Sequence, residues 1–167
     1  MQLPWRRFGR TNLKMPVFSL GGMRFQKSWD EMKLSDISKN DQKKLENILN
    51  LASEFGFNHI ETAKYYGTSE IQLGMAFQST KKIPKIIQTK IPPNNDTKVF
   101  EAELLKSFEK LQVNKIDLLA IHGINLPEHL HQAVKEGGCI DILNKFKKDN
   151  LIGHIGFSTH GESSLIE

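Results

Sequence analysis

Ionisable side chains stand at the ends of several apolar runs along this chain. A run of nearly consecutive apolar residues is typical of a strand buried on both faces, where a charged group has no favourable place. Three such runs end in Glu61, Lys90 and His122, and Tyr66 follows Glu61 by five residues. A carboxylate, an ammonium, an imidazole and a phenol brought to one apolar site form a set of proton-transfer groups.

These four side chains could together deliver a proton to a carbonyl oxygen. A phenol has an unperturbed pKa of about 10 and is a weak acid near neutrality. A neighbouring ammonium stabilises the phenolate, so we expect Lys90 to lower the pKa of Tyr66, and Glu61 to keep Lys90 charged. A neutral His122 could then donate a hydrogen bond to the substrate oxygen. Because no residue of the set supplies hydride, a nicotinamide cofactor would be needed.

The elements that must position these groups alternate along the chain. We expect helices where apolar residues recur with helical period, at residues 45–55, 100–111 and 140–146, with Asn40 or Asp41 as the N-cap of the first. The apolar runs are the expected strands: Val17 to Gly22, Phe57 to Thr62, Lys85 to Lys90, Ile116 to His122 and Gly153 to Thr159. Successive strands begin about 28 to 40 residues apart, which is the size of a βαβ unit.

Strands that alternate with helices predict an α/β fold with a mainly parallel sheet, either an open doubly wound sheet or a (β/α)8 barrel. A nucleotide-binding doubly wound sheet carries G-x-G-x-x-G after its first strand, whereas residues 20–24 read LGGMR. No G-x-x-x-x-G-K-S/T phosphate loop occurs either. We therefore predict a parallel (β/α)8 barrel of the TIM type, with its active site at the carboxyl ends of the strands.

The expected domain is a single one over residues 1–167, and it is an incomplete barrel. Residues 1–17 read as an N-terminal β-hairpin, and residues 18–167 supply about five βα units. A complete barrel needs about 250 residues, so we expect the domain to be truncated relative to a closed one. An unclosed parallel sheet leaves two edges and an apolar face exposed, so we expect self-association or a partner chain to cover the open sheet.

Composition and charge argue against several classes of protein. Hydrophobic residues make up 38% and charged residues 25% of the chain, as in ordinary globular proteins. The mean hydropathy is -0.41, and no apolar run approaches the roughly 18 residues of a membrane span. The net charge of +4 comes from dispersed lysine pairs, so we expect no nucleic-acid partner. The single cysteine, Cys139, and the lack of a secretory signal predict a cytoplasmic protein.

One run of the sequence resembles the signature of the aldo-keto reductase family. In FNHIETAKYYGTSEIQLGMAF, as in that signature, an acidic residue, Thr-Ala, two variable residues and Tyr-Gly precede Ser-Glu and Leu-Gly. Further runs are similar to the family in the same order: FGRTNLKMPVFSLGGMRF, IIQTK before Pro92-Pro93, KIDLLAIHGIN, and LIGHIGFSTH, which is similar to the fifth-strand segment. The resemblance therefore covers essentially the whole chain.

The resemblance implies NAD(P)H-dependent reduction of an aldehyde or ketone, with a small-molecule carbonyl compound as the substrate. It implies that Tyr66 is the general acid, that Lys90 lowers the pKa of Tyr66, and that His122 orients and polarises the carbonyl. Glu61 stands where the family usually has aspartate. Since glutamate is one methylene longer, the contact with Lys90 must be built differently from that in the family.

The resemblance also implies a cofactor site, with NADP(H) as the expected cofactor and NAD(H) as the alternative. Gly22 and Met23 would approach the cofactor from the first strand, and Ser158 with Thr159 would meet its nicotinamide amide. Most contacts with the adenosine 2′-phosphate are implied to come from the second half of the barrel. The most similar members form a bacterial branch that often carries a C-terminal iron–sulfur segment. Cys139 alone cannot hold a cluster, so we expect neither an iron–sulfur cluster nor another metal site.

Two other functions remain open on the same scaffold, because a fold does not fix a function. The chain could be a non-catalytic cofactor-binding or regulatory subunit, or a truncated chain that needs a partner to close the barrel. Each candidate residue alone also fits a structural role: Lys90 as a solvated lysine at a strand end, His122 as a structural hydrogen-bonding group. Their occurrence in one order along the chain favours catalysis.

Overall fold

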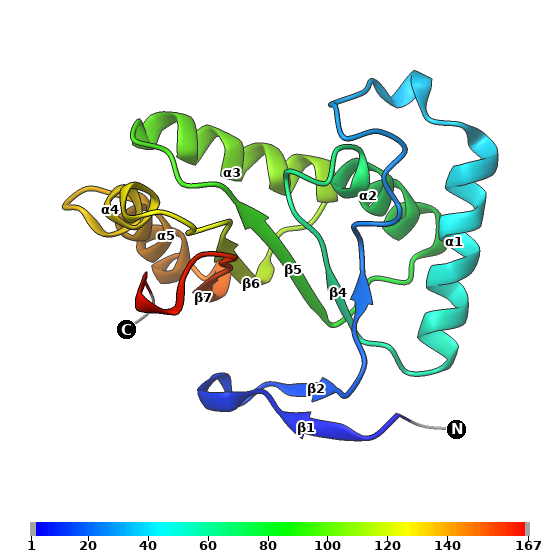
Figure 1. Ribbon diagram of the computed structural model, residues 1–167. Helices are drawn as coiled ribbons and strands as arrows, with labels where there is room; N and C mark the ends of the chain where they lie inside the picture. Colours follow the sequence, from blue (N-terminus) through cyan, green and yellow to red (C-terminus); the bar gives the residue numbers. More distant parts are fainter. Residues whose placement is uncertain (1–2, 166–167) are drawn as a thin grey trace.

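The sheet at the centre of the molecule confirms the predicted parallel α/β architecture (Figure 1). The computed structural model describes residues 3–165. Five strands lie in the order β3-β4-β5-β6-β7, each parallel to its neighbours: Leu20–Gly21, His59–Glu61, Ile86–Ile91, Ile116–Ile121 and Ile152–Phe157. Neighbours in the sheet are successive strands in the sequence, as in part of a (β/α)8 barrel. The barrel is incomplete, because β3 and β7 each have one partner strand within residues 3–165.

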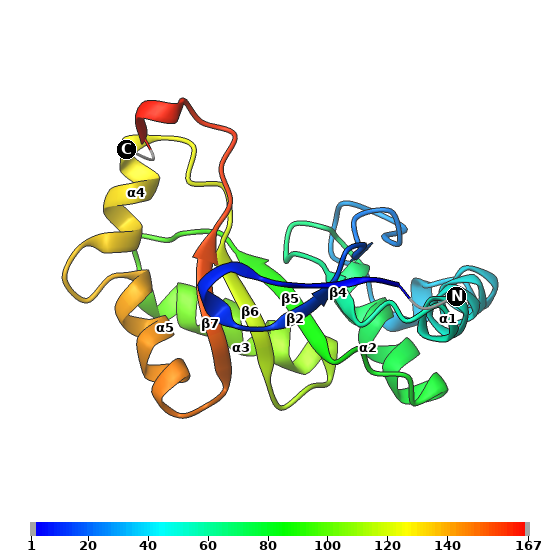
Figure 2. The same ribbon diagram turned by 90° about the horizontal axis from the view of Figure 1, so that it is seen from below.

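The helices pack along the outer face of this sheet (Figure 1, Figure 2). They are α1 (Lys39–Glu54), α2 (Ser69–Thr80), α3 (Thr97–Leu111), α4 (Pro127–Val134) and α5 (Cys139–Lys148). Helix α1 begins directly after Ser38, whose hydroxyl accepts a hydrogen bond from the Asp41 backbone N–H (3.4 Å). The prediction of Asn40 or Asp41 as the N-cap is therefore wrong. The helix starts earlier, and the Asp41 carboxylate pairs instead with Lys27 (2.9 Å).

The outer face of the strands forms the apolar core together with the helices. Ile60 of β4 and Ile87 of β5 pack against α1 and α2, and Leu119 of β6 packs against α3 and α5. All three side chains are at most 3% exposed. Because successive side chains along a strand point to opposite faces, Glu61 and Lys90 point to the inner face.

A β-hairpin covers the inner face at the end of the sheet where the strands begin (Figure 2). Its strands, β1 (Trp5–Arg7) and β2 (Lys14–Pro16), pair antiparallel around a turn in which Asn12 has a φ of 58°. Met15 of β2 is 7% exposed and packs with Ile86 and Leu118 near the start of β5 and β6. The hairpin therefore leaves the opposite end of the sheet, where the strands finish, uncovered.

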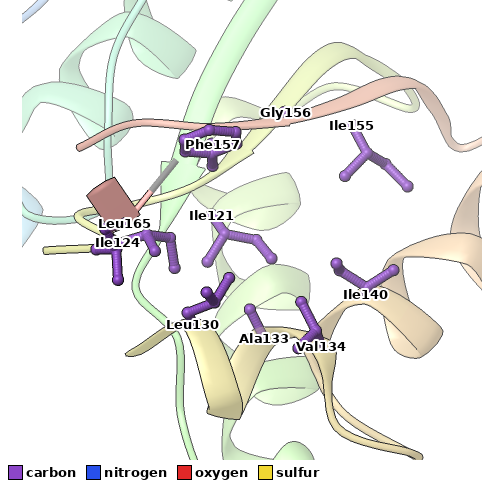
Figure 3. Close-up of a pocket in the computed structure, with 10 residues that line it drawn as sticks. All are labelled: Ile121, Ile124, Leu130, Ala133, Val134, Ile140, Ile155, Gly156, Phe157 and Leu165. Carbon is purple, nitrogen blue, oxygen red and sulfur yellow. The ribbon is translucent and has the colours of Figure 1, made fainter. Parts of the chain in front are cut away.

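An apolar groove lies beside β7, on the outer side of the sheet edge (Figure 3). Its volume is about 310 Å³, and β6, α4, α5 and β7 contribute its walls. Val134 and Phe157, which line it, are 56% and 54% exposed. None of the helices within residues 3–165 has the length and apolar character that a membrane span requires. Apolar side chains therefore face solvent beside this strand edge.

A buried carboxyl group ties α2 to β5 and α3. Glu70 is 1% exposed and accepts hydrogen bonds from Thr89 Oγ1 (2.6 Å) and Ser107 Oγ (3.1 Å). Burial raises the pKa of Glu70 above its ordinary 4.5, although both hydrogen bonds act in the opposite direction. Since Thr89 directly precedes Lys90, this network also fixes the part of β5 that carries the lysine.

Replacing the Glu70 carboxyl by an amide is expected to change how stability depends on pH. The raised pKa means that the folded state binds the proton more tightly than the unfolded state. This contribution to stability is fully present below pH 4.5 and is lost as the pH rises through the folded-state value. Glu70→Gln keeps the side-chain shape and does not titrate.

We therefore expect the Tm of Glu70→Gln to rise relative to wild type as the pH increases, with a gain of about 2 to 4 °C at pH 8, which corresponds to about 1 kcal/mol. Thermal unfolding of both chains between about pH 4 and pH 8 measures this difference. A difference in Tm that stays constant over the range would contradict the role given to Glu70.

Candidate active site

The carboxyl ends of three neighbouring strands bring Glu61, Lys90 and His122 together on the inner face of the sheet. Glu61 is the last residue of β4, Lys90 is the penultimate residue of β5, and His122 directly follows β6. Lys90 lies beside Ala120 in the register of β5 and β6, and the His122 N–H donates to the Ile91 carbonyl (2.7 Å). The parallel register thus holds the three side chains at one level of the sheet.

Lys90 and Glu61 form a largely buried ion pair. Lys90 Nζ contacts Glu61 Oε1 and donates a hydrogen bond to the Thr62 carbonyl (3.1 Å). The Lys90 side chain is 8% exposed and the Glu61 side chain 25%. Burial lowers the pKa of Lys90 to about 8, while the adjacent carboxylate favours the charged ammonium. A glutamate at position 61 therefore reaches the lysine.

Tyr66 lies on the loop between β4 and α2, with its ring next to the ammonium of Lys90. Lys90 Nζ is 4.7 Å from the centre of the Tyr66 ring, which is cation–π contact distance. The loop turns sharply at this point: the Tyr66 N–H donates to the Ala63 carbonyl (3.0 Å), and Gly67 has a φ of +51°. A side chain at position 67 would collide with the Ser28 carbonyl, so the turn that presents Tyr66 needs glycine.

The expected lowering of the Tyr66 pKa by Lys90 is corrected by the structure. Burial raises the pKa of Tyr66 above 10.0. The ammonium lies over the face of the ring and is bound by Glu61 and the Thr62 carbonyl, so the stabilisation that its charge gives the phenolate is smaller than the cost of burial. Tyr66 is therefore protonated at neutral pH, as a proton donor must be.

His122 packs against two tyrosines and is neutral. Its ring centre lies 5.9 Å from that of Tyr66, edge to face, and 5.5 Å from that of Tyr65. Burial, followed by the charge of Lys90, lowers the pKa of His122 to about 4. Its Nδ1 is buried without a hydrogen-bond partner among residues 3–165. A proton on Nδ1 would be left unsatisfied, so the tautomer with the proton on Nε2 is favoured.

The segment after β3 is bound to the end of β4. The Gly22 N–H donates to the Glu61 carbonyl (2.6 Å), and Ser69 Oγ donates to the Gly22 carbonyl (2.9 Å). A Cβ at position 22 would lie 2.9 Å from both the Glu61 carbonyl oxygen and Ser69 Oγ, so this close approach needs glycine. Gly21 has no atom within 4 Å of a Cβ position, and Met23 is 37% exposed. The unobstructed backbone surface is therefore at Gly21 rather than at Gly22.

Ser158 and Thr159 follow β7 and hydrogen-bond around the loop after β6. Ser158 Oγ accepts from the Gly123 N–H (3.1 Å), which leaves its O–H to donate to a ligand. Thr159 Oγ1 donates to the Ile124 carbonyl (2.5 Å) and accepts from the Gly161 N–H (2.9 Å). The Thr159 hydroxyl therefore holds the loop, whereas the Ser158 hydroxyl retains a donor.

Three contributors to this site were missed by the sequence reasoning. The Thr62 carbonyl binds Lys90, the Ser69 hydroxyl fixes Gly22, and the Tyr65 ring packs against His122. A backbone carbonyl has no residue signature, so nothing in the sequence could have identified the first. Ser69 belongs to the Ser-Glu pair of the signature, which was the available signal, and the adjacent Tyr65 is itself aromatic.

The site fits a flat organic cofactor better than a metal ion. Gly21 on β3 and Gly156 on β7 each have no atom within 4 Å of a Cβ position, so the backbone is accessible on both sides of the site. The Ser158 O–H is a suitable donor to a nicotinamide amide. In the part of the chain that the structure describes, no group of three His, Cys, Asp or Glu side chains could hold a metal ion.

Both the sequence and the fold of this chain are similar to those of known proteins. A sequence model of the aldo/keto reductase family matches residues 18–167. The fold is similar to that of a Pseudomonas aeruginosa protein assigned to the aldo-keto reductases, with a TM-score of 0.74, 24% identity and coverage of 93% of this chain and 60% of that chain. A search of the curated proteins finds no match.

Two further solved structures are similar to this chain. The holo form of an aldo-keto reductase from Bacillus halodurans has a TM-score of 0.73 and 19% identity, covering 95% of this chain and 51% of that one. An aldo-keto reductase from Bombyx mori in complex with NADP has a TM-score of 0.64 and 21% identity, covering 94% of this chain and 50% of that one. This chain therefore spans between half and 60% of the length of the three structures.

Proposed function

Because the chain belongs to the aldo/keto reductase family, we propose that it is an oxidoreductase that uses NADPH to reduce an aldehyde or ketone. The observation that carries this proposal is the contact of Lys90 with both Glu61 and the Tyr66 ring, next to a neutral His122. These residues lie at the carboxyl ends of parallel strands, which is where barrel enzymes bind and convert their substrates.

Tyr66 is the proton donor in the proposed reaction. Its raised pKa keeps the phenol protonated at neutral pH, and a general acid must hold its proton until the substrate oxygen gains negative charge. His122 donates a hydrogen bond from Nε2 to the same oxygen, which polarises the carbonyl and orients it toward Tyr66. The edge-to-face packing of the two rings brings the two side chains together in one part of the site.

Lys90 supplies the positive charge that opposes the charge left on Tyr66 after proton transfer. Burial strengthens this effect, because few water molecules screen a side chain that is 8% exposed. Glu61 acts through Lys90 as a positioning residue: it keeps the ammonium charged and near the ring. At neutral pH Lys90 is therefore protonated, although burial lowers its pKa to about 8.

The cofactor site of the proposed enzyme borders this set of residues. When bound, NADPH would supply the hydride that the protein lacks. The Ser158 hydroxyl would hold the nicotinamide amide, and the backbone at Gly21, with Gly22 and Met23 after it, would border the cofactor. Thr159 would hold the adjoining loop after β6. The Bombyx mori relative in complex with NADP supports NADP(H), with NAD(H) as the alternative. We also place the enzyme in the cytoplasm, in keeping with its single cysteine.

Carbonyl-dependent oxidation of NADPH tests the proposed activity. The purified chain is mixed with NADPH and a panel of aldehydes and ketones, and the loss of NADPH absorbance is followed. Turnover that requires the carbonyl compound supports the reductase. Saturable quenching or enhancement of cofactor fluorescence without turnover of any compound would favour a non-catalytic cofactor-binding subunit instead.

The edge at β7 favours a second property, association with another chain. A strand edge presents unpaired backbone donors and acceptors, and the groove beside β7 adds exposed apolar side chains. We propose that a second copy or a partner chain covers this edge. The expected result is a light-scattering mass of about twice the 19.1 kDa of one chain. A mass of 19.1 kDa at all concentrations would contradict self-association.

A further inference from the structure

A second hollow adjoins His122 on the side that faces α4. It has a volume of about 310 Å³ and lies between the end of β5, the loop from β6 into α4, and the segment after β7. We call it the α4 pocket. Besides Tyr65, six polar side chains line it: His122, Asn125, Glu128, His129, Gln132 and His160. His122 also packs against Tyr66, so the α4 pocket shares one of its walls with the candidate active site.

The α4 pocket offers hydrogen-bonding atoms that contacts within the protein do not use. Asn125 Oδ1 accepts from the His160 backbone N–H (2.7 Å), which leaves the Asn125 amide N–H groups to donate. His129 Nδ1 lies 3.0 Å from a carbonyl of the loop after β6, which leaves Nε2. Glu128 Oε1 accepts a long hydrogen bond from Gln132 (3.3 Å), which leaves Oε2. A hydroxyl group can donate to some of these atoms and accept from others.

The charge of the α4 pocket restricts its ligand further. Glu128 is the one acidic side chain in its lining, and among residues 3–165 no lysine or arginine lines it. A phosphate or carboxylate placed there would face a like charge without a cation to pair with. The groove beside β7 has a similar volume but an apolar lining. The polar lining therefore distinguishes the α4 pocket from that groove.

We propose that the α4 pocket binds the part of the substrate beyond the carbonyl, and that this part is neutral and carries hydroxyl groups. Glu128 would accept a hydrogen bond from a substrate hydroxyl, and the Asn125 amide would donate one. Glu128 is then the specificity-determining residue that excludes anionic substrates. The inference rests on the proposed reductase function, and it narrows the substrate class of that same site.

A matched series of aldehydes tests the substrate class. The compounds are benzaldehydes that carry hydroxymethyl, ethyl or carboxylate at the position opposite the aldehyde, so that size and reactivity change little. We expect kcat/KM for the hydroxymethyl compound to exceed that for the ethyl compound by about fivefold, the factor that one net hydrogen bond supplies. The carboxylate compound is expected to be the poorest substrate.

Two substitutions at Glu128 separate its charge from its hydrogen bond. Glu128→Gln is expected to keep the preference for hydroxymethyl over ethyl and to improve the carboxylate compound. Glu128→Ala is expected to lose the hydroxymethyl preference. Glu136→Gln is the matched control, because Glu136 is exposed after α4 and does not line the α4 pocket, so it should leave the ranking unchanged.

A binding measurement keeps the inference testable without turnover. The probes are 4-methylbenzyl alcohol and 1-ethyl-4-methylbenzene, which cannot be reduced and of which only the first carries a hydroxyl group. The readout is the NMR shift of the His129 and His160 ring signals, and we expect shifts with the first compound and weaker ones with the second. If no aldehyde is reduced, the proposed function fails and these shifts decide the inference. Turnover in which the ethyl or carboxylate compound matches the hydroxymethyl compound would overturn it, as would equal shifts with both probes.

Discussion

Tyr66→Phe is expected to lower kcat for carbonyl reduction by about 10²- to 10⁴-fold, which is the contribution of a general acid. The substitution removes the phenolic hydroxyl and keeps the ring that packs under Lys90 and against His122. Cofactor affinity and Tm are therefore expected to change little. Steady-state kinetics at saturating NADPH measures the loss of kcat, a titration with NADPH measures cofactor affinity, and thermal unfolding measures Tm.

The matched control for this variant is Tyr65→Phe, which removes the same hydroxyl from the adjacent residue. Tyr65 is 56% exposed, its ring also packs against His122, and Lys64 lies 5.5 Å from its centre. Its surroundings are thus similar to those of Tyr66, but it lacks a contact with Lys90. We expect a far smaller loss of kcat. Losses of equal size in the two variants, or no loss in Tyr66→Phe, would exclude Tyr66 as the acid.

Lys90→Met is expected to lower kcat by about 10²- to 10³-fold, the effect of removing one preorganised electrostatic group. It is also expected to change the pH profile. Wild-type kcat should fall as the pH rises through about 8, because Lys90 loses its proton there and no longer opposes the charge on Tyr66. The residual activity of Lys90→Met should show no such fall, because methionine does not titrate.

Lys64→Met is the control for the charge of Lys90. Lys64 pairs with Glu103 (3.1 Å) and lies over the Tyr65 ring, so it matches Lys90 in type and in its tyrosine contact. Its replacement should leave the pH profile with the fall near 8 in place. The account would be contradicted if Lys90→Met kept the wild-type profile, or if Lys64→Met abolished the fall.

The sequence was sufficient to predict that the site residues lie together at one end of the sheet. Each apolar run specifies a buried strand, and parallel neighbours finish at one end of the sheet, so Glu61, Lys90 and His122 had to approach one another. The hairpin before the first long run was predictable for a similar reason: residues 1–17 contain short extended pieces around a turn. These inferences depend only on which residues are apolar and on their order.

Two of the helices could not be predicted from periodicity. Helix α2 buries polar residues such as Glu70 and Gln72 along with Leu73 and Phe77, so it has no one-sided apolar stripe. Helix α4 spans only Pro127–Val134, two turns, which is too short for a repeating pattern to stand out. The α4 pocket could not be predicted either, since its walls come from segments far apart in the sequence.

The direction of the Tyr66 pKa shift depends on side-chain geometry, which cannot be read from the sequence. The residue types predict that an ammonium near a phenol lowers the pKa of the phenol. In the structure Lys90 binds Glu61 and the Thr62 carbonyl and lies over the ring face, so burial has the larger effect on Tyr66. The Thr159 hydroxyl is likewise used by the loop after β6, which its residue type could not reveal.

The most direct test of the central claim, that this site transfers hydride and proton to a carbonyl, is deuterium transfer. The chain is incubated with NADPH deuterated at the transferable position of the nicotinamide and with 4-(hydroxymethyl)benzaldehyde, and the alcohol is analysed by NMR. The account predicts deuterium on the former carbonyl carbon with wild type, and none above background over the same time with Tyr66→Phe. Recovery of unchanged aldehyde from the wild-type reaction, with the cofactor bound, would contradict it.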